Sequence, residues 1–158
     1  MMNTWRSQID VRAEPEEVLE TLTDIDACKA WSPVAFDVGE LECGRLRAGT
    51  KVPVSGAIAG RRVRFCVEIL RADSERLLLR AAGPVEMHAD YLVRPANGGS
   101  RLHAAVSLRR GTGGGARLAA RATSILLATG VLNHALGRIA REAERRQELG
   151  AQARSQAA

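Results

Sequence analysis

Apolar and polar residues alternate near the start of the chain, which predicts a β-strand over residues 4–12. One side of this strand carries Trp5, Ser7, Ile9 and Val11. Pro15 and the acidic residues after it suit the first turn of a short helix, because proline needs no amide hydrogen bond there and acids complement the helix dipole. We expect a second short helix near 25–31, ending before Pro33, since the residue ahead of a proline avoids the helical region.

The middle of the chain has the pattern of strands separated by short turns. We expect strands near 35–43, 50–58, 62–71, 76–82, 85–94 and 101–109. Pairing Val93 with Leu102 brings apolar residues together along the last hairpin, and pairing Ile69 with Leu77 does so around the turn that begins at Ala72. Both hairpins then have one apolar and one charged face. The pattern therefore indicates an antiparallel meander with one side in water.

A long helix is expected near 115–147, after the glycine-rich stretch at 111–115. Its apolar side carries Leu118, Ala122, Ile125, Leu126, Thr129, Leu132, Asn133, Leu136, Ile139, Ala140 and Ala143. Arginines and His134 occupy the opposite side, and Gly130 marks a bend. At roughly 1.5 Å per residue the helix is long enough to cross a small sheet. We expect one domain over residues 1–150 and a disordered tail at 151–158.

Composition narrows the classes of function. No apolar run reaches the roughly 18 residues that a membrane-spanning helix needs, and the first residues lack the pattern of a signal peptide. The 3 cysteines, an odd number without close spacing, favour a reduced, cytoplasmic setting over a disulfide framework. The net charge is +5, with the basic excess after residue 50, which allows an anionic partner. Aromatic residues make up 3%, which disfavours the base-stacking surfaces of nucleic-acid binders.

The order of the predicted elements resembles the START-like, or SRPBCC, superfamily. Four stretches carry the resemblance: Ile9-Asp10-Val11-Arg12-Ala13-Glu14-Pro15-Glu16-Glu17-Val18, Asp24 with Trp31-Ser32-Pro33, Gly49-Thr50, and Gly98-Gly99-Ser100-Arg101-Leu102. Within the superfamily the chain looks most like the polyketide cyclase/dehydrase and lipid-transport branch. The resemblance covers about 4–147. It implies an α+β helix-grip fold, in which a curved seven-stranded antiparallel sheet wraps around the long C-terminal helix, with two short helices after the first strand.

Small residues on the apolar faces favour a cavity between the sheet and the long helix. They are Gly56, Ala81, Ala89, Ala104, Ala122 and Ala140. A cavity lined by aliphatic side chains suits an apolar small molecule. The alternative is that these residues only let the helix pack closely on the sheet.

We expect the ligand to contact Tyr91, Met87, Ala104, Phe65, Thr129, Asn133, Leu126 and Leu136. Thr129 and Asn133 are neighbours on the helix surface, where a ligand oxygen would partner them. The alternative is that Thr129 bonds back to the preceding turn and Asn133 bonds to the sheet or a loop. Tyr91 is a weak candidate for a proton donor. The histidines, with His88 and His103 on the charged sheet face, lack the spacing of metal ligands, and we expect neither metal nor cofactor.

Three functions remain open. The first is binding or transport of a hydrophobic small molecule, such as a lipid, a quinone or a polyketide-like compound. The second is an aromatase/cyclase-type enzyme, as the cyclase branch implies, with Tyr91 as acid or base and with Thr129 and Asn133 orienting the substrate. The third is interaction with a protein or RNA, supported by the basic charge alone. An apolar strip on the outer side of the helix either packs under a loop or forms a homodimer contact; it comprises Leu127, Ala128, Val131 and Ala135.

Overall fold

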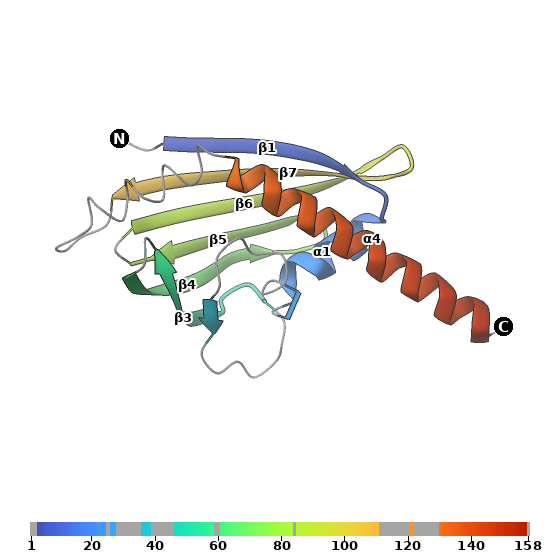
Figure 1. The fold of residues 1–158 in the computed structure, drawn as a ribbon, viewed down its shortest axis with the longest axis horizontal. Coiled ribbons are helices and arrows are strands. Elements are labelled where there is room, and N and C mark those ends of the chain that lie inside the picture. The colour runs from blue at the N-terminus through green and yellow to red at the C-terminus, as the bar shows by residue number, and fades with distance from the viewer. Residues whose placement is uncertain are drawn as a thin grey trace.

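Seven strands form one antiparallel sheet in the order β1-β7-β6-β5-β4-β3-β2 (Figure 1). The computed structural model describes residues 3–24, 26–27, 36–38, 46–58, 61–83, 85–110, 121 and 130–157. The strands are β1 Asn3–Val11, β2 Phe36–Val38, β3 Lys51–Ile58, β4 Arg61–Ala72, β5 Arg76–Ala82, β6 Val85–Ala96 and β7 Gly99–Arg110. The expected seven-stranded antiparallel sheet is therefore confirmed, while the predicted continuation of β2 to residue 43 lies outside the described residues.

The β6–β7 hairpin has the register that the sequence predicted. Val93 is opposite Leu102, and the pairing runs without a shift to the end of the hairpin. The two residues of the turn are Asn97 and Gly98, and Gly98 has a φ of 80°. Asparagine followed by glycine suits a two-residue hairpin turn, because such turns require left-handed backbone. The turn residues and the apolar pattern therefore specify the same register.

The register of β4 with β5 differs from the prediction. Ile69 lies opposite Leu79 and not Leu77, and the pairing shifts between Ile69 and Arg71. The turn lies further along the chain than predicted, with Ala72 opposite Leu77. A β-bulge then inserts one extra residue in β4, which leaves Leu70 and Arg71 together on the solvent side and brings Ile69 opposite Leu79. Leu70 is accordingly 43% exposed. Apolar residues still meet on the opposite face, so the prediction had the correct face and the wrong partners.

The β6–β7 hairpin contacts the end of β1 at Gly99. A Cβ atom on this glycine would lie 2.1 Å from the carbonyl oxygen of Val11 and 2.9 Å from the backbone nitrogen of Ala13. The hydroxyl of the neighbouring Ser100, a buried residue, donates a hydrogen bond of 2.6 Å to the carbonyl oxygen of Ala13. Backbone packs directly on backbone here, which holds the segment between β1 and the first helix against the sheet.

Two helices lie on one face of the sheet: α1, Pro15–Thr23, and α4, Val131–Ala157 (Figure 1). As predicted, α1 has a proline and acidic side chains in its first turn. Contacts join α1 to β5, β6 and β7, whereas α4 runs along β1 and also contacts α1 and β7. Of the second short helix predicted near 25–31, Asp26 and Ala27 are described and helical, and the rest lies outside the described residues.

The long C-terminal helix differs from its prediction at both ends. The sequence predicts one helix over 115–147 with a bend at Gly130, but Gly130 has a φ of 88°, a left-handed value that ends α-helical geometry, so α4 begins at Val131. Apart from Arg121, residues 111–129 lie outside the described part of the chain. At the other end α4 continues to Ala157, through the stretch expected to be disordered. Its alanine, glutamine and arginine residues favour helix even where they are exposed.

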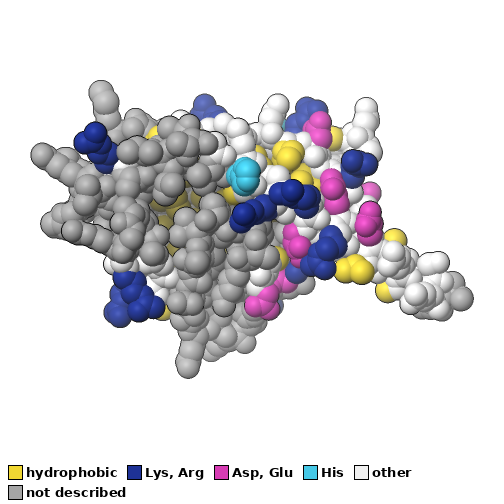
Figure 2. Space-filling view, viewed as in Figure 1, with side chains coloured by type: hydrophobic (Ala, Val, Ile, Leu, Met, Phe, Trp, Pro, Cys, Tyr) yellow, Lys and Arg dark blue, Asp and Glu magenta, His cyan; other side chains and the backbone are white. Residues whose placement is uncertain are grey.

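The exposed side of α4 is basic, as the helical pattern predicted. It carries His134, Arg138, Arg141 and Arg145, and Figure 2 shows basic side chains along this helix. Ala135, which was expected on the outer side, is 5% exposed and therefore buried within the single chain. Leu127, Ala128 and the Val131 side chain, which complete the strip considered for a homodimer contact, lie outside the described part of the structure.

Candidate ligand-binding face

The sheet separates apolar from charged side chains through its period of two residues. We call the face toward α1 and α4 the inner face. On β3–β7 it carries Val52, Val54, Gly56, Val63, Phe65, Val67, Ile69, Leu77, Leu79, Ala81, Val85, Met87, Ala89, Tyr91, Val93, Leu102, Ala104, Val106 and Leu108. The outer face carries the charged residues of the same strands whose side chains are described. An apolar inner face of this kind is a surface that a hydrophobic molecule can contact.

The two helices close one part of the inner face. A buried cluster joins Val18 and Leu22 of α1 to Leu136 and Ile139 of α4 and to Leu102 of β7. Each of these five side chains is at most 1% exposed. Full burial of an aliphatic side chain contributes about 1.5–3 kcal/mol. This cluster, here called the packed region, therefore fixes both helices on the sheet.

Another part of the inner face stays accessible. Six apolar residues on β3–β6, here called the accessible patch, are half-buried: Val54, Val63, Phe65, Val67, Leu79 and Met87. Val54 lies opposite Phe65, and Val67 and Met87 both lie opposite Ala81, so the patch is continuous across these strands. Trp5 on β1 is also half-buried. The accessible patch is where the inner face can still bury apolar surface.

The predicted ligand-lining residues of the sheet, together with Leu136 of α4, divide between these two regions. Tyr91, Ala104 and Leu136 belong to the buried cluster, with 7%, 3% and 1% of their surfaces exposed. Met87 and Phe65 are half-buried members of the accessible patch. The structure therefore places Tyr91, the weak candidate for a proton donor, among packed apolar side chains, and leaves Met87 and Phe65 available for contact.

Asn133, from the helix part of the predicted set, bonds to the sheet. The hydroxyl of Ser7 on β1 donates a hydrogen bond to Asn133 Oδ1, and Asn133 is an exposed residue. This contact ties α4 to the edge strand and matches the structural alternative that the sequence left open. Two further predicted helix residues, Leu126 and Thr129, lie outside the described residues.

An ion pair joins the end of α1 to α4. Arg146 donates a hydrogen bond to Asp24 Oδ2, and the two side chains are 24% and 25% exposed. Burial raises the pKa of the Asp24 carboxyl, but the hydrogen bonds from Arg146, Ala27 and Asp26 and the charge of Arg146 outweigh this effect and lower the pKa below its ordinary value. Glu142 Oε1 also lies 3.6 Å from Arg146 Nε. The charged carboxylate of Asp24 therefore stabilises the contact between the helices.

We expect the contribution of Asp24 to stability to disappear in acid. Because its pKa is lower in the folded chain, the carboxylate stabilises the fold above the unfolded pKa of 3.8, and this contribution is lost as the pH falls through the folded value. Asp24→Asn should lower the free energy of unfolding by roughly 1 kcal/mol near pH 7 and by less near pH 2. Urea unfolding at both pH values tests this, and a difference that does not change with pH would contradict it.

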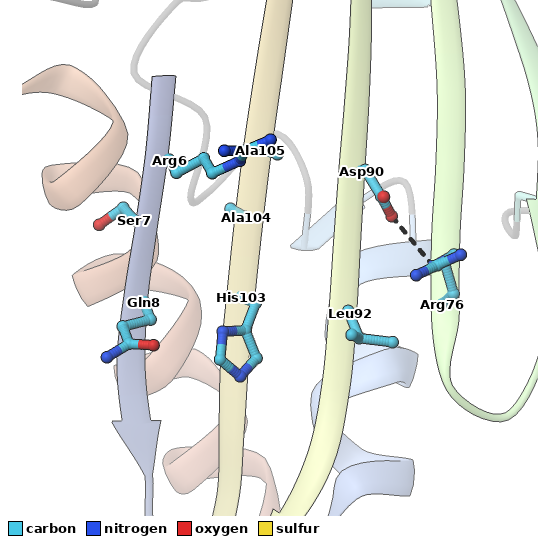
Figure 3. A pocket seen from close by; sticks show the side chains of 9 residues that line it. All are labelled: Arg6, Ser7, Gln8, Arg76, Asp90, Leu92, His103, Ala104 and Ala105. Atoms are coloured by element: carbon cyan, nitrogen blue, oxygen red, sulfur yellow. Dashed lines mark ion pairs between the residues drawn. The ribbon is translucent and has the colours of Figure 1, made fainter. Parts of the chain in front are cut away.

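The outer face carries a polar hollow of about 410 Å³ (Figure 3). It is lined by Arg6, Ser7, Gln8, Arg76, Asp90, Leu92, His103, Ala104 and Ala105. Ala105 lies between Arg6 and Asp90 in the sheet register, so a small side chain separates two charged ones. Arg76 Nε and Asp90 Oδ1 lie 3.2 Å apart as an ion pair, although the two atoms are not aligned as a hydrogen bond. The hollow differs from the predicted cavity in both its face and its polarity.

Part of this arrangement was not predicted from the sequence. Val54, Val67 and Leu79 were not named as ligand contacts, although their inward positions in alternating strands were a usable signal. The outer hollow was also missed, because it depends on the register of four strands. Ala105, a small residue among charged neighbours, was the signal for it.

Within the described part of the chain, no three His, Cys, Asp or Glu side chains gather in a way that could hold a metal ion. Cys66 is exposed and has a free thiol, while Cys28 and Cys43 lie outside the described residues. Neither of the two described helices is both long and apolar enough to cross a membrane.

Solved structures share this fold across nearly the whole chain. Protein CV1439 from Chromobacterium violaceum has a TM-score of 0.68 and 19% identity, covering 90% of this chain and 97% of that one. The protein TTHA0849 from Thermus thermophilus has a TM-score of 0.65 and 18% identity, covering 89% and 97%. Protein NE0264 from Nitrosomonas europaea has a TM-score of 0.64 and 15% identity, covering 92% and 96%. At these identities the likeness shows the fold alone.

The family follows from the sequence itself. No curated protein matches the chain. The sequence model of the family described as "Polyketide cyclase / dehydrase and lipid transport" matches residues 2–144. This match covers most of the 158 residues and includes β1, the sheet and the packed part of α4. The expected START-like resemblance is therefore confirmed, and the chain belongs to the polyketide cyclase/dehydrase and lipid transport family.

Proposed function

We propose that this protein binds or transports a hydrophobic small molecule, such as a lipid, a quinone or a polyketide-like compound, on the inner face of its sheet. The accessible patch carries the proposal, because it is an apolar surface that the fold leaves half-buried. Each Å² of apolar surface removed from water contributes about 25 cal/mol, so a molecule that covers the patch gains free energy without any specific polar contact. The lipid-transport part of the family description supports the same class of ligand.

The positions of the polar candidates favour binding over cyclase-type catalysis. A general acid or base must come within hydrogen-bond reach of the reacting group. Tyr91 is 7% exposed and belongs to the same buried cluster as Leu136. Asn133, considered as an orienting residue, accepts its hydrogen bond from Ser7. The enzyme roles considered for these two residues therefore gain no support from their surroundings.

Trp5 offers an optical test of the proposal. The chain has 2 tryptophans. In the Trp31→Phe variant, Trp5 is the one tryptophan left to transfer excitation energy to a bound dye. In the sheet register Trp5 aligns with Val106, Ala89 and Leu79 across neighbouring strands, so about 15 Å separate it from the patch at the usual strand spacing. N-phenyl-1-naphthylamine, an uncharged apolar dye, should show saturable energy transfer from Trp5. Transfer that is absent, or that rises without saturation, would contradict the proposal.

Filling the accessible patch should weaken dye binding. Val67→Phe adds a ring at a half-buried inward position of β4, where it takes up volume that the dye would occupy. We expect the dye affinity to fall at least about tenfold, equivalent to 1.4 kcal/mol. The measurement is the same energy-transfer titration, made in the Trp31→Phe background.

Cys66→Phe is the matched control for this variant. It places the same ring one residue away on β4, where the side chain is exposed on the outer face. This variant should keep its dye affinity within about twofold, since strand neighbours point to opposite faces. Thermal unfolding of both variants establishes that they are folded. Equal loss of affinity in the two variants would remove the patch as the binding surface.

A further inference from the structure

The described charged side chains of the sheet gather on its outer face, where several of them pair with one another. Arg76 lies 3.2 Å from Asp90, and Arg101 lies 2.9 Å from Asp10. The described side chains at the inward positions around the accessible patch are aliphatic, aromatic or thioether groups. The register also places Arg61 opposite Ile58 and Arg110 opposite Val85, and the side chains of these two arginines lie outside the described residues. Among the described side chains of the sheet, the charged groups therefore lie on the outer face and the accessible patch is apolar. A ligand on the inner face meets apolar side chains, and the paired charges lie behind the sheet.

The hydroxyl groups that point inward from the described strands lie in or beside the packed region and are engaged there. Ser7 donates its hydrogen bond to Asn133, and Ser100 donates to the carbonyl oxygen of Ala13. Tyr91 is buried in the packed region. A head group placed on the accessible patch would instead contact carbon atoms and the Met87 sulfur. Such surroundings cannot replace the hydration of an ion.

We infer that the protein selects uncharged ligands over ionised ligands with the same hydrocarbon chain. The inference deepens the proposed function and rests on it, because it presupposes binding at the accessible patch. An ionised carboxylate or ammonium loses far more hydration free energy on an apolar surface than a hydroxyl or ester does. Alcohols, esters and quinones are therefore the ligand classes that the patch favours, and fatty acid anions and amines are those it disfavours.

The overall charge of the chain predicts a different order of ligand affinities from the order that desolvation at the patch predicts. A net charge of +5 attracts anions over long range and repels cations. If that attraction governed binding, a fatty acid anion would bind better than the matching alcohol. Desolvation at the patch predicts the reverse order for the anion and predicts weak binding for the cation as well. The affinity of the fatty acid anion relative to that of the matching alcohol therefore distinguishes long-range attraction from desolvation.

Competition against N-phenyl-1-naphthylamine tests the inference in the Trp31→Phe chain. Dodecan-1-ol, methyl dodecanoate, dodecanoate and dodecylamine share one alkyl chain and differ in head-group charge at about pH 7.5. The alcohol and the ester should displace the dye at concentrations at least about tenfold lower than either ion. All titrations stay below the concentration at which each amphiphile forms micelles. The methyl ester is the decisive control, because it removes the charge of dodecanoate and keeps its carbonyl group.

A counter-charge on the inner face should reverse the preference. Met87→Arg introduces a permanent cation at a half-buried position of the patch, and it should bring dodecanoate to at least the affinity of dodecan-1-ol. His88→Arg is the matched control, because His88 is the next residue of β6, lies on the outer face and already contacts Glu86 at 3.3 Å. The His88→Arg variant should bind the four ligands in the same order of affinity as the unaltered chain. If Met87→Arg does not fold, competition by the four ligands in the Trp31→Phe chain still tests the selectivity for uncharged ligands.

The outcomes separate this inference from the function on which it rests. If the dye does not bind, the proposed function fails and the inference fails with it. If the dye binds and dodecanoate displaces it within about threefold of dodecan-1-ol, the function stands and the selectivity is overturned. Weak displacement by both ions, with strong displacement by the alcohol and the ester, supports the inference. Strong displacement by dodecanoate alone would show that long-range attraction governs binding.

Discussion

Replacing Gly99 with alanine should lower the free energy of unfolding by about 3 kcal/mol or more, a large share of the stability of an ordinary domain. The new Cβ atom would lie 2.1 Å from the Val11 carbonyl oxygen and 2.9 Å from the Ala13 nitrogen. Both are backbone atoms, so the clash cannot be relieved by turning a side chain. The φ of 155° at Gly99 adds strain for any residue with a Cβ atom. Relief requires moving β1 away from the β6–β7 hairpin.

Gly98→Ala is the control for this prediction, because it alters the adjacent residue of the same hairpin. Gly98 has a φ of 80°, but a Cβ atom there would meet nothing within 4 Å. We therefore expect only the conformational cost of about 1–2 kcal/mol for a left-handed residue. Urea unfolding of the two variants measures the difference. Equal losses would show that the contact with Val11 does not decide the stability of this corner.

Local patterns were sufficient to predict the sheet. Alternation identifies strands because each half-buried strand must place its apolar side chains on one face. In the β6–β7 hairpin the turn residues and the apolar pattern agree, and the predicted pairing of Val93 with Leu102 is confirmed. In the β4–β5 hairpin the turn lies further along the chain than predicted, and the bulge after Ile69 offsets this by one residue, so the partners differ by two residues and the face is kept. Alternation specifies the face of a residue but does not reveal an extra residue inserted into one strand.

The degree to which a side chain is buried was harder to predict than the face of the sheet on which it lies. Tyr91 and Met87 lie on β6 and point the same way, and the sequence placed both beside a ligand. The structure buries Tyr91 in the packed region and leaves Met87 half-buried. The difference depends on where α1 and α4 cross the sheet, which is set by contacts far apart in the sequence. One such contact is the bond between Ser7 and Asn133, 126 residues apart.

The division of the inner face has a functional consequence. Close-packed side chains resist deformation, so the packed region keeps the helices and strands in fixed positions. The accessible patch adjoins this rigid region on the same strands, and a bound molecule therefore contacts a surface that is already formed. Preorganisation of this kind lowers the conformational entropy lost on binding. Packing and binding are thus separate tasks of one apolar face, and they can be perturbed separately.

Removing part of the packed region should test this separation. Ile139→Ala deletes a side chain of α4 that is 0% exposed and shares the buried cluster with Val18 and Leu102. We expect the free energy of unfolding to fall by about 2–5 kcal/mol, since the loss combines the transfer of the removed atoms with the cavity left behind. Leu149→Ala is the control on the same helix, because Leu149 is 52% exposed, and it should change stability by less than about 0.5 kcal/mol.

Urea unfolding measures the stability of both variants, and dye titration at low temperature measures binding by the molecules that remain folded. Because Ile139 belongs to the packed region and not to the accessible patch, Ile139→Ala should keep the dye affinity within about twofold of the unaltered chain. Val67→Phe should show the opposite combination of weak binding and near-normal stability. A large loss of dye affinity in folded Ile139→Ala would mean that the dye sits under α4, within the cluster assigned here to packing. Binding and packing would then compete for the same side chains.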